Sequence, residues 1–184
     1  MKLLLEQWRQ YVDEIEARPS LGTGKEKDNI EFVHWAKKDA DKKGTYDHGN
    51  PTYVNHGGLK IQIAKKDDHT KLIAHNENDQ PVGYLATEPF KNGVKIGVVA
   101  VGAEYRGQGV AKRLYDYVIQ NNNVYSGDSQ TPESKGLWDS FKNKYNVKAV
   151  NVKTGEEVPV DDSIYTQEGE ESNNVYLFIP RGGQ

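Results

Sequence analysis

The 184-residue sequence contains no cysteine, so disulfide bonds, thiolate metal sites and a cysteine nucleophile are excluded. No apolar run approaches the ~20 residues that a membrane-spanning helix needs. Basic residues are not in excess either, because 24 Lys and Arg stand against 27 Asp and Glu and give a net charge of −3. Nucleic-acid-binding domains usually carry a clear basic excess. We therefore expect a cytoplasmic protein that binds neither membranes nor nucleic acid.

Signatures of several enzyme classes are also missing. The nucleotide-hydrolase loop G-x-x-x-x-G-K-[ST] and the serine-hydrolase elbow G-x-S-x-G do not occur. None of the five histidines has the spacing of metal ligands on one helix or hairpin, so we expect no metal. A mean hydropathy of −0.83 is low for a globular domain and predicts long polar loops.

The apolar periodicity changes near residue 59 and divides the chain into an N-terminal region and a core. Up to residue 58 we expect an amphipathic helix over residues 2–17, a short helix around 29–38 and otherwise loops. From residue 59 to 180, strands and helices are joined by polar turns. The predicted strands are 59–65, 70–75, 82–88, 94–101, 123–126, 147–152 and 175–179, and the predicted helices are 109–120 and 132–145. The first four strands form an antiparallel meander, and residues 1–184 are expected to form one domain.

The most informative segment is VKIGVVAVGAEYRGQGVA, residues 94–111. An apolar strand leads into a turn with two glycines, and a helix begins directly after Gly109. The first turn of a helix has backbone N–H groups without intrahelical partners and carries partial positive charge. Glycine lets the backbone approach an anion closely. This order of strand, glycine turn and helix predicts a site for a diphosphate-bearing ligand, and a turn without any ligand is the alternative.

The spacing of Arg106, Gly109 and Ala111 fits the pattern [QR]-x-x-G-x-[GA]. It does not fit the dinucleotide fingerprint G-x-G-x-x-G, because position 112 is lysine. With the preceding run VGAEYR, the segment resembles the pyrophosphate loop of the GCN5-related N-acetyltransferase (GNAT) superfamily. The resemblance covers about residues 59–180. It implies an α/β fold whose mixed, mostly antiparallel sheet is flanked by helices and splayed between its fourth and fifth strands, here 94–101 and 123–126.

The resemblance also implies acetyl-CoA as the cosubstrate and a primary amine as the acyl acceptor. The coenzyme would lie along strand 94–101 and add to it as β-augmentation does for peptides. Gly97 within this strand predicts the bulge with which the family splits its sheet. The implied coenzyme-binding residues are Val99, Ala100, Val101, Arg106, Gly107, Gln108, Gly109, Val110 and Ala111. Lys112 and Arg113 in the first helical turn either neutralise phosphate or form a solvated helix face.

Acyl transfer to an amine needs a base for the amine proton, a donor for the oxyanion and often an acid for the leaving thiolate. Glu88 is the candidate base, and an exposed carboxylate without a role is the alternative. In the family the acid is often a tyrosine after the fifth strand. Trp138 aligns with that position, and an indole N–H is no acid, so we expect Trp138 in the acceptor pocket or in the core. The candidate substitutes for the acid are Tyr125, Ser126 and Tyr145.

An acidic stretch precedes the last predicted strand. It either walls the acceptor site and attracts a cationic amine or forms a solvated loop. Its members are Glu156, Glu157, Asp161, Asp162, Glu168, Glu170 and Glu171. The departure at Trp138 leaves a second function open, a non-catalytic binding or assembly module on the same scaffold. A transferase with another acyl donor, such as an aminoacyl-tRNA, is a third reading that the net charge argues against. The apolar strand 175–179 is compatible with a homodimer.

Overall fold

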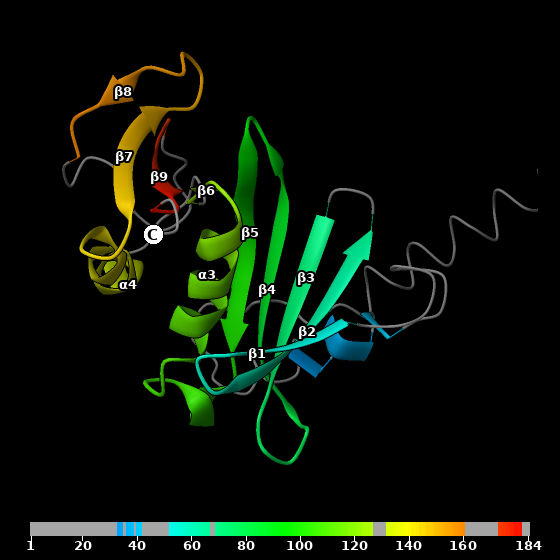
Figure 1. The fold of residues 1–184 in the computed structure, drawn as a ribbon. Coiled ribbons are helices and arrows are strands. Elements are labelled where there is room, and N and C mark those ends of the chain that lie inside the picture. The colour runs from blue at the N-terminus through cyan, green and yellow to red at the C-terminus, as the bar shows by residue number, and fades with distance from the viewer. Residues whose placement is uncertain are drawn as a thin grey trace, which may run out of the picture.

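The computed structural model describes residues 33–34, 36–38, 40–41, 52–66, 69–126, 132–160 and 173–181. They form a nine-stranded sheet with helices against its faces (Figure 1). The strand order is β1-β2-β3-β4-β5-β6-β9-β7-β8. Neighbouring strands are antiparallel except β5 and β6, which are parallel. The predicted fold class, a mixed and mostly antiparallel sheet flanked by helices, is therefore confirmed.

The predicted strands and the two predicted core helices begin and end close to their expected positions, and β1, β8 and η2 are additional. The strands are β1 (Thr52–His56), β2 (Leu59–Lys66), β3 (His69–His75), β4 (Pro81–Phe90), β5 (Gly93–Val101), β6 (Val124–Tyr125), β7 (Asn146–Asn151), β8 (Glu157–Val158) and β9 (Asn174–Ile179). The helices are the 3-10 turn η2 (Ala103–Tyr105), α3 (Val110–Asn121) and α4 (Pro132–Lys142).

The two halves of the sheet meet at a short joint between β5 and β6. Within the described ranges, the pairs there are Val94 with Val124 and Lys95 with Tyr125. Beyond Lys95, β5 continues beside β4 for six residues with no register partner on the β6 side in the described part of the chain. The expected splay between these two strands is therefore present, and it opens toward the C-terminal end of β5.

A bulge in β5 lies just beyond this joint. Ala86 pairs with Val98 and Thr87 pairs with Ile96, so Gly97 is skipped by the ladder, as its position in an apolar strand predicts. The extra residue shifts the side-chain alternation by one. As a result, Ile96 and Val99 face the same side of the sheet, whereas Val98 faces the other.

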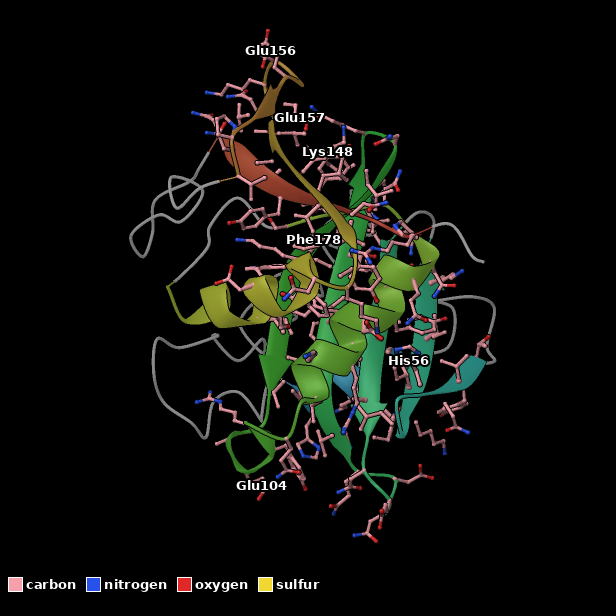
Figure 2. All side chains as sticks on the ribbon, turned by 60° about the vertical axis from the view of Figure 1, so that its left-hand side comes forward. His56, Glu104, Lys148, Glu156, Glu157 and Phe178 are labelled. Carbon is pink, nitrogen blue, oxygen red and sulfur yellow. The ribbon has the colours of Figure 1, made fainter. Side chains whose placement is uncertain are left out.

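Helices α3 and α4 cover one face of the sheet. Leu114 and Val118 of α3 recur at helical spacing and join the same apolar core as Leu85 of β4. In α4, Phe141 meets Phe178 of β9 edge to face, with ring centroids 6.1 Å apart. Figure 2 shows Phe178 in the centre of the molecule, close to α4.

The opposite face of the sheet is covered by the N-terminal region. Residues 33, 34, 36–38 and 40 are helical, which confirms part of the short helix expected around 29–38. Val33, Ala36 and Ala40 are buried against a patch of β2, β3, β4 and β5. The expected helix over residues 2–17 lies outside the described residues.

Two strands were not predicted from the sequence. Residues 52–56 were expected to be a loop, but they form the edge strand β1, which a two-residue turn at Gly57 and Gly58 joins to β2. Both glycines have positive φ, 56° and 81°, as tight hairpin turns require. Strand β8 has only two residues and pairs with β7. Both are short or polar edge strands, which carry little apolar alternation.

Candidate active site

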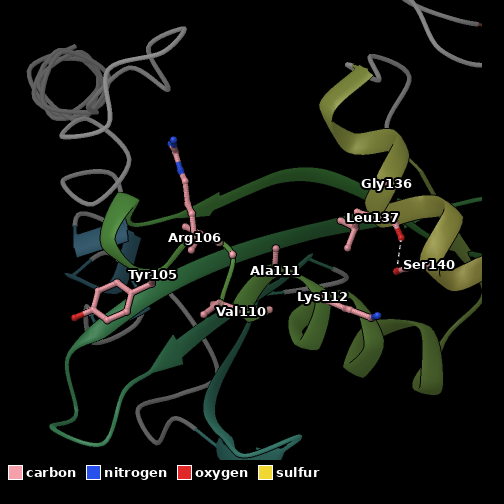
Figure 3. A pocket seen from close by; sticks show the side chains of 11 residues that line it. Tyr105, Arg106, Val110, Ala111, Lys112, Gly136, Leu137 and Ser140 are labelled. Atoms are coloured by element: carbon pink, nitrogen blue, oxygen red, sulfur yellow. Dashed lines mark hydrogen bonds between the residues drawn. The ribbon is translucent and has the colours of Figure 1, made fainter.

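A cavity of about 560 Å³ lies where the splay opens (Figure 3). The end of β5, the turn after it, the N-terminus of α3 and one side of α4 form its walls. Its lining residues are Val101, Tyr105, Arg106, Gly107, Gly109, Val110, Ala111, Lys112, Gly136, Leu137 and Ser140. Six of the nine predicted coenzyme-binding residues are among them, namely Val101, Arg106, Gly107, Gly109, Val110 and Ala111.

The glycine turn presents bare backbone to this cavity. Gly107 and Gly109 have φ of 73° and 76°, a region that side-chain-bearing residues rarely adopt. A Cβ built on either glycine would have no neighbouring atom within 4 Å, so the space in front of both is open. Gly109 caps α3, and its carbonyl accepts the N–H of Arg113 as the first helical bond. The N–H groups of Val110, Ala111 and Lys112 precede that bond and have no acceptor within the helix.

Charge in the cavity lining is all of one sign. Arg106 and Lys112 line it, and no carboxylate does so among the described residues. In Figure 3 the side chain of Arg106 points away from Val110 and Ala111, whereas that of Lys112 extends from α3 toward the side on which Ser140 of α4 lies. Together with the positive end of the α3 dipole they make the cavity attractive to a multiply charged anion.

The backbone of β5 supplies a second set of groups, which have no strand partner on the β6 side in the described part of the chain. The N–H of Gly102 donates to the carbonyl of Val82 in β4 at 3.0 Å. Backbone groups of alternate residues point to opposite edges of a strand, so those of Val99 and Val101 point away from β4, toward the splay. Ala100 has the opposite orientation, and its side chain is buried against the N-terminal helical residues.

Gln108 has a different place from the other loop residues. Its side-chain amide donates to the carbonyl of Glu104 at 2.8 Å and braces the turn. It does not line this cavity and instead lines a second one on the other side of α3. Arg113 lies on that side too, whereas Lys112 faces the first cavity. The two adjacent cations of α3 therefore serve different cavities.

The candidate base Glu88 lies on β4 opposite Lys95, close to the joint of the sheet. Its carboxylate is 3.4 Å from the ammonium group of Lys95, and 43% of its side chain is exposed. It does not line the described cavity. Glu88 nevertheless lies close to the bulge in β5. Its neighbour Thr87 pairs with Ile96, and Ile96 precedes the bulged Gly97.

The candidate acids Ser126 and Tyr145 are both committed to internal contacts. Ser126 is fully buried, and its hydroxyl accepts the N–H of Tyr176 at 3.0 Å. The Tyr145 hydroxyl donates to the carboxylate of Asp116, and burial and this carboxylate raise the pKa of Tyr145 well above its ordinary value. Neither side chain lines the cavity. The third candidate, Tyr125, is buried, and its hydroxyl donates to Asn92 at 2.6 Å.

Asp116 gathers several donors in the middle of α3. Lys144 donates to it at 2.6 Å, and an imidazole nitrogen of His56 lies 3.0 Å from the carboxylate. Burial by itself raises the pKa of Asp116, but the hydrogen bonds from Lys144, Tyr145 and His56 outweigh it and hold this pKa below its ordinary 3.8. The cluster ties the β1–β2 turn and the end of α4 to α3.

Trp138 belongs to the core by its contacts. Its indole is 2% exposed and stacks on Phe178, with centroids 5.0 Å apart and planes 19° apart. Tyr115 meets it edge to face at 4.9 Å. It does not line the described cavity, and the neighbouring Leu137 does so instead. Of the two interpretations of this residue, core packing is the one that these contacts support.

Four cavity residues were not identified from the sequence as members of the site. Tyr105 follows β5 within η2, while Gly136, Leu137 and Ser140 come from one face of α4. The Ser140 hydroxyl donates to the carbonyl of Leu137 at 2.6 Å. Residues 136, 137 and 140 share one face of α4 by their helical spacing. This spacing points to the site only once it is known that α4 packs opposite α3.

The acidic stretch is described only in part. Glu156 and Glu157 lie at the tip of the β7–β8 hairpin, and Figure 2 shows them at the opposite end of the molecule from Glu104 beside the glycine turn. Glu157 pairs with Lys148 at 2.7 Å. The other five members lie outside the described residues. Among the residues that the structure covers, no group of three or more histidines and carboxylates is placed to hold a metal ion. No helix in the described ranges is long and apolar enough to cross a membrane.

Comparison with known proteins agrees with this geometry. The family model described as "Acetyltransferase (GNAT) domain" matches residues 40–132, about half of the chain. A search of curated proteins found no significant match. Among solved structures, the ribosomal-protein-S18-alanine N-acetyltransferase of Escherichia coli is 12% identical, with 65% of this chain and 75% of that chain covered and a TM-score of 0.42.

Two further structures are similar at the same level. A GNAT-family acetyltransferase of Staphylococcus aureus Mu50 is 19% identical, with 61% of this chain and 68% of that chain covered and a TM-score of 0.40. A GNAT-superfamily phosphinothricin acetyltransferase of Sinorhizobium meliloti, solved in complex with AcCoA, is 14% identical, with 62% and 63% covered and a TM-score of 0.39. With the family model matching the segment that holds the splay, the bulge and the glycine turn, the chain belongs to the GNAT acetyltransferase family.

Proposed function

We propose that this protein is an N-acetyltransferase that transfers an acetyl group from acetyl-CoA to a primary amine. The observation that carries the proposal is the open glycine turn at the N-terminus of α3, beside a sheet that splays at the same end. The family match supports acyl transfer in general. We further propose that residues 1–184 act as one domain in the cytoplasm.

The residues of the cavity fit the coenzyme. The diphosphate would accept hydrogen bonds from the N–H groups of Gly109, Val110 and Ala111. The space beside Gly109 is open, because a Cβ built there would have no neighbouring atom within 4 Å. Arg106 and Lys112 would neutralise its charge. The pantetheine arm would pair with the backbone groups of β5 that point into the splay, as an added strand does.

The reaction would take place at the bulge, where β5 parts from β6. The amine nitrogen attacks the thioester carbonyl carbon, the carbon–sulfur bond breaks, and the sulfur leaves with the bonding pair. The N–H of Val99 would stabilise the oxyanion that forms, because it points into the splay. Glu88 would take the amine proton, directly or through one water, since it lies one residue from the Thr87–Ile96 pair.

The leaving thiolate would depart without a dedicated acid from the predicted set. The hydroxyls of Ser126 and Tyr145 are engaged by Tyr176 and Asp116. A thiol such as that of cysteine has a pKa of only ~8.5, so a thiolate can leave and collect its proton from water. We therefore propose a structural role for Ser126 and Tyr145 in place of the acid role.

The same observation favours one alternative, a module of this scaffold that binds the coenzyme without turnover. Both functions predict acetyl-CoA binding, so binding alone does not separate them. Release of free thiol from acetyl-CoA on a panel of polyamines, amino sugars, amino acids and lysine peptides does so. Turnover with any amine supports the enzyme, and binding without turnover across the panel supports the module.

Isothermal titration with acetyl-CoA tests the coenzyme site itself. We expect saturable binding, and absence of heat and of any thermal shift at millimolar acetyl-CoA would refute it. The matched pair of variants is Gly109→Ala and Gly155→Ala, because both glycines have left-handed φ, 76° and 78°, but Gly155 lies in the β7–β8 turn. Only Gly109→Ala should lose binding. Gel filtration with light scattering tests whether the chain forms the homodimer with which the apolar strand 175–179 is compatible.

A further inference from the structure

A third cavity, of about 220 Å³, lies under the C-terminal half of α3, between this helix and strands β2, β3, β4 and β5. It shares no lining residue with the two cavities beside the glycine turn. The proposed transfer reaction uses none of the residues that line it. At ~30 Å³ per water molecule, its volume corresponds to about seven waters, which suits a small organic molecule and not a nucleotide or a coenzyme.

Three hydrogen-bond donors stand in one row across the floor of this cavity. Lys65 of β2 pairs with Thr70 of β3, and Thr70 pairs with Thr87 of β4. Residues directly opposite each other in an antiparallel ladder face the same side of the sheet, and all three line the cavity. An ammonium group beside two hydroxyl groups is suited to hold the oxygens of a carboxylate.

Thr87 is a buried donor that no described residue engages. Only 4% of this residue is exposed, and its hydroxyl makes no hydrogen bond within the described part of the chain. Lys65 has no carboxylate partner among the described residues either, and no carboxylate lines the cavity. A buried hydroxyl without a partner costs free energy, which a ligand that accepts its hydrogen bond would recover.

The roof of the cavity, at the end of α3, offers acceptors instead. The side-chain amide of Asn121 donates to the carbonyl of Tyr117 at 2.7 Å, and that of Asn122 donates to the carbonyl of Val118 at 3.1 Å. The two amide oxygens accept no hydrogen bond from described residues and can accept one from a ligand. The last carbonyls of a helix also carry partial negative charge. This side of the cavity therefore attracts a cationic donor such as an ammonium group.

Apolar side chains complete the lining. Ile63 and Leu72 belong to the floor and Val118 to the roof, and all three are buried. A ligand that matches the whole cavity therefore has a carboxylate, an ammonium group and a small apolar part. A free α-amino acid with an aliphatic side chain combines these three features.

We propose that the third cavity binds a small aliphatic α-amino acid. Its carboxylate contacts Lys65, Thr70 and Thr87. Its ammonium group donates to the amide oxygens of Asn121 and Asn122, and its side chain lies on the apolar floor. The site is separate from the proposed coenzyme cavity, so the assignment does not depend on the proposed function.

The test is isothermal titration of the full chain with L-alanine, L-valine and L-leucine. For each amino acid the matched probes are the amine without the carboxylate and the carboxylate without the amine, which for L-valine are isobutylamine and 3-methylbutanoate. The test variants are Thr87→Val, which removes the hydroxyl at nearly constant size, and Lys65→Gln at an exposed position. The control is Thr52→Val on the edge strand β1, which lines none of the three cavities. Gly109→Ala separates this site from the coenzyme cavity.

We expect at least one of the three amino acids to bind saturably, and its two matched probes to bind at least tenfold more weakly. Thr87→Val and Lys65→Gln should weaken binding by a similar factor, because each loses a contact to a charged group. Thr52→Val and Gly109→Ala should bind like the wild type. Absence of heat with all three amino acids would overturn the proposal, and so would wild-type affinity of both Thr87→Val and Lys65→Gln. Loss of binding in Gly109→Ala would also overturn it, because the amino acid would then occupy the coenzyme cavity.

Discussion

Gly83 of β4 is the position where one added carbon should disturb the coenzyme site most directly. A Cβ built on Gly83 would lie 2.6 Å from Cγ1 of Val110, the first residue of α3. Ordinary contacts are near 3.5 Å, the distance at which the same Cβ would meet Leu114, so the start of α3 must retreat by roughly 1 Å. The N–H groups of the diphosphate site move with it, because they belong to the same helical turn.

Overpacking of this size costs about 1–3 kcal/mol of the free energy of unfolding. For a chain of this length that corresponds to a fall of roughly 2–12 °C in melting temperature. We also expect Gly83→Ala to bind acetyl-CoA at least tenfold more weakly, since hydrogen bonds lengthened by 1 Å lose most of their strength. Thermal unfolding and isothermal titration measure the two effects separately.

Val110→Ala is the matched second substitution, because it removes the methyl group that the new Cβ meets. The double variant should recover coenzyme affinity and be more stable than the sum of the two single effects predicts. Two results would refute the reasoning. One is wild-type stability and affinity of Gly83→Ala, and the other is strict additivity of the two substitutions in both measurements.

Four further predictions concern other parts of the molecule. Gly109→Ala and Gly155→Ala should each lose about 1 kcal/mol of stability, from the left-handed backbone, but calorimetry should show lost acetyl-CoA binding only for Gly109→Ala. Glu88→Gln should lower kcat about 100-fold without changing the KM for acetyl-CoA, and an unchanged kcat would remove this residue as the base. Trp138→Ala should cost about 3–5 kcal/mol in urea unfolding while leaving the coenzyme cavity lined as before, and a small cost would contradict its core position. The pKa of Asp116 is lowered on folding, so its contribution to stability is present above about pH 4 and is lost as pH falls through the folded pKa. The stability difference between the wild type and Asp116→Asn should therefore shrink between pH 6 and pH 3, and a constant difference would contradict the hydrogen bonds assigned to this carboxylate.

The sequence predicts well those parts of the fold that depend on the local order of apolar residues and glycines. The four strands of the meander alternate with period two, and α3 carries an apolar stripe that includes Leu114 and Val118. The bulge was predictable because Gly97 interrupts an apolar strand. The glycine turn was predictable because its conformation requires glycine, as the φ values of Gly107 and Gly109 show.

The rest depends on contacts between segments far apart in the chain. The α4 side of the cavity, with Gly136, Leu137 and Ser140, exists only because α4 packs opposite α3. The edge strand β1 is polar and mostly exposed, so its sequence lacks the alternation of apolar residues from which a strand is predicted. The candidate acids illustrate the same limit, because the hydroxyl of Tyr145 is directed by Asp116, 29 positions earlier, and nothing local to Tyr145 indicates that.

A two-residue joint between β5 and β6 connects the two halves of this sheet. Among the described residues, the ladder along this seam has the pairs Val94–Val124 and Lys95–Tyr125, and the N–H of Val94 donates to the carbonyl of Asn123. The hydroxyl of Tyr125 and the side-chain amide of Asn123 also donate to Asn92, just before β5. From Lys95 to the end of β5 the free edge runs roughly 20 Å at ~3.3 Å per residue. A tilt of about 5° at the seam would therefore move the far rim by roughly 2 Å. The splay opens at the C-terminal end of β5, whereas the seam lies at the N-terminal end of this strand. Small side-chain changes at the seam should therefore alter the width of the opening from a distance.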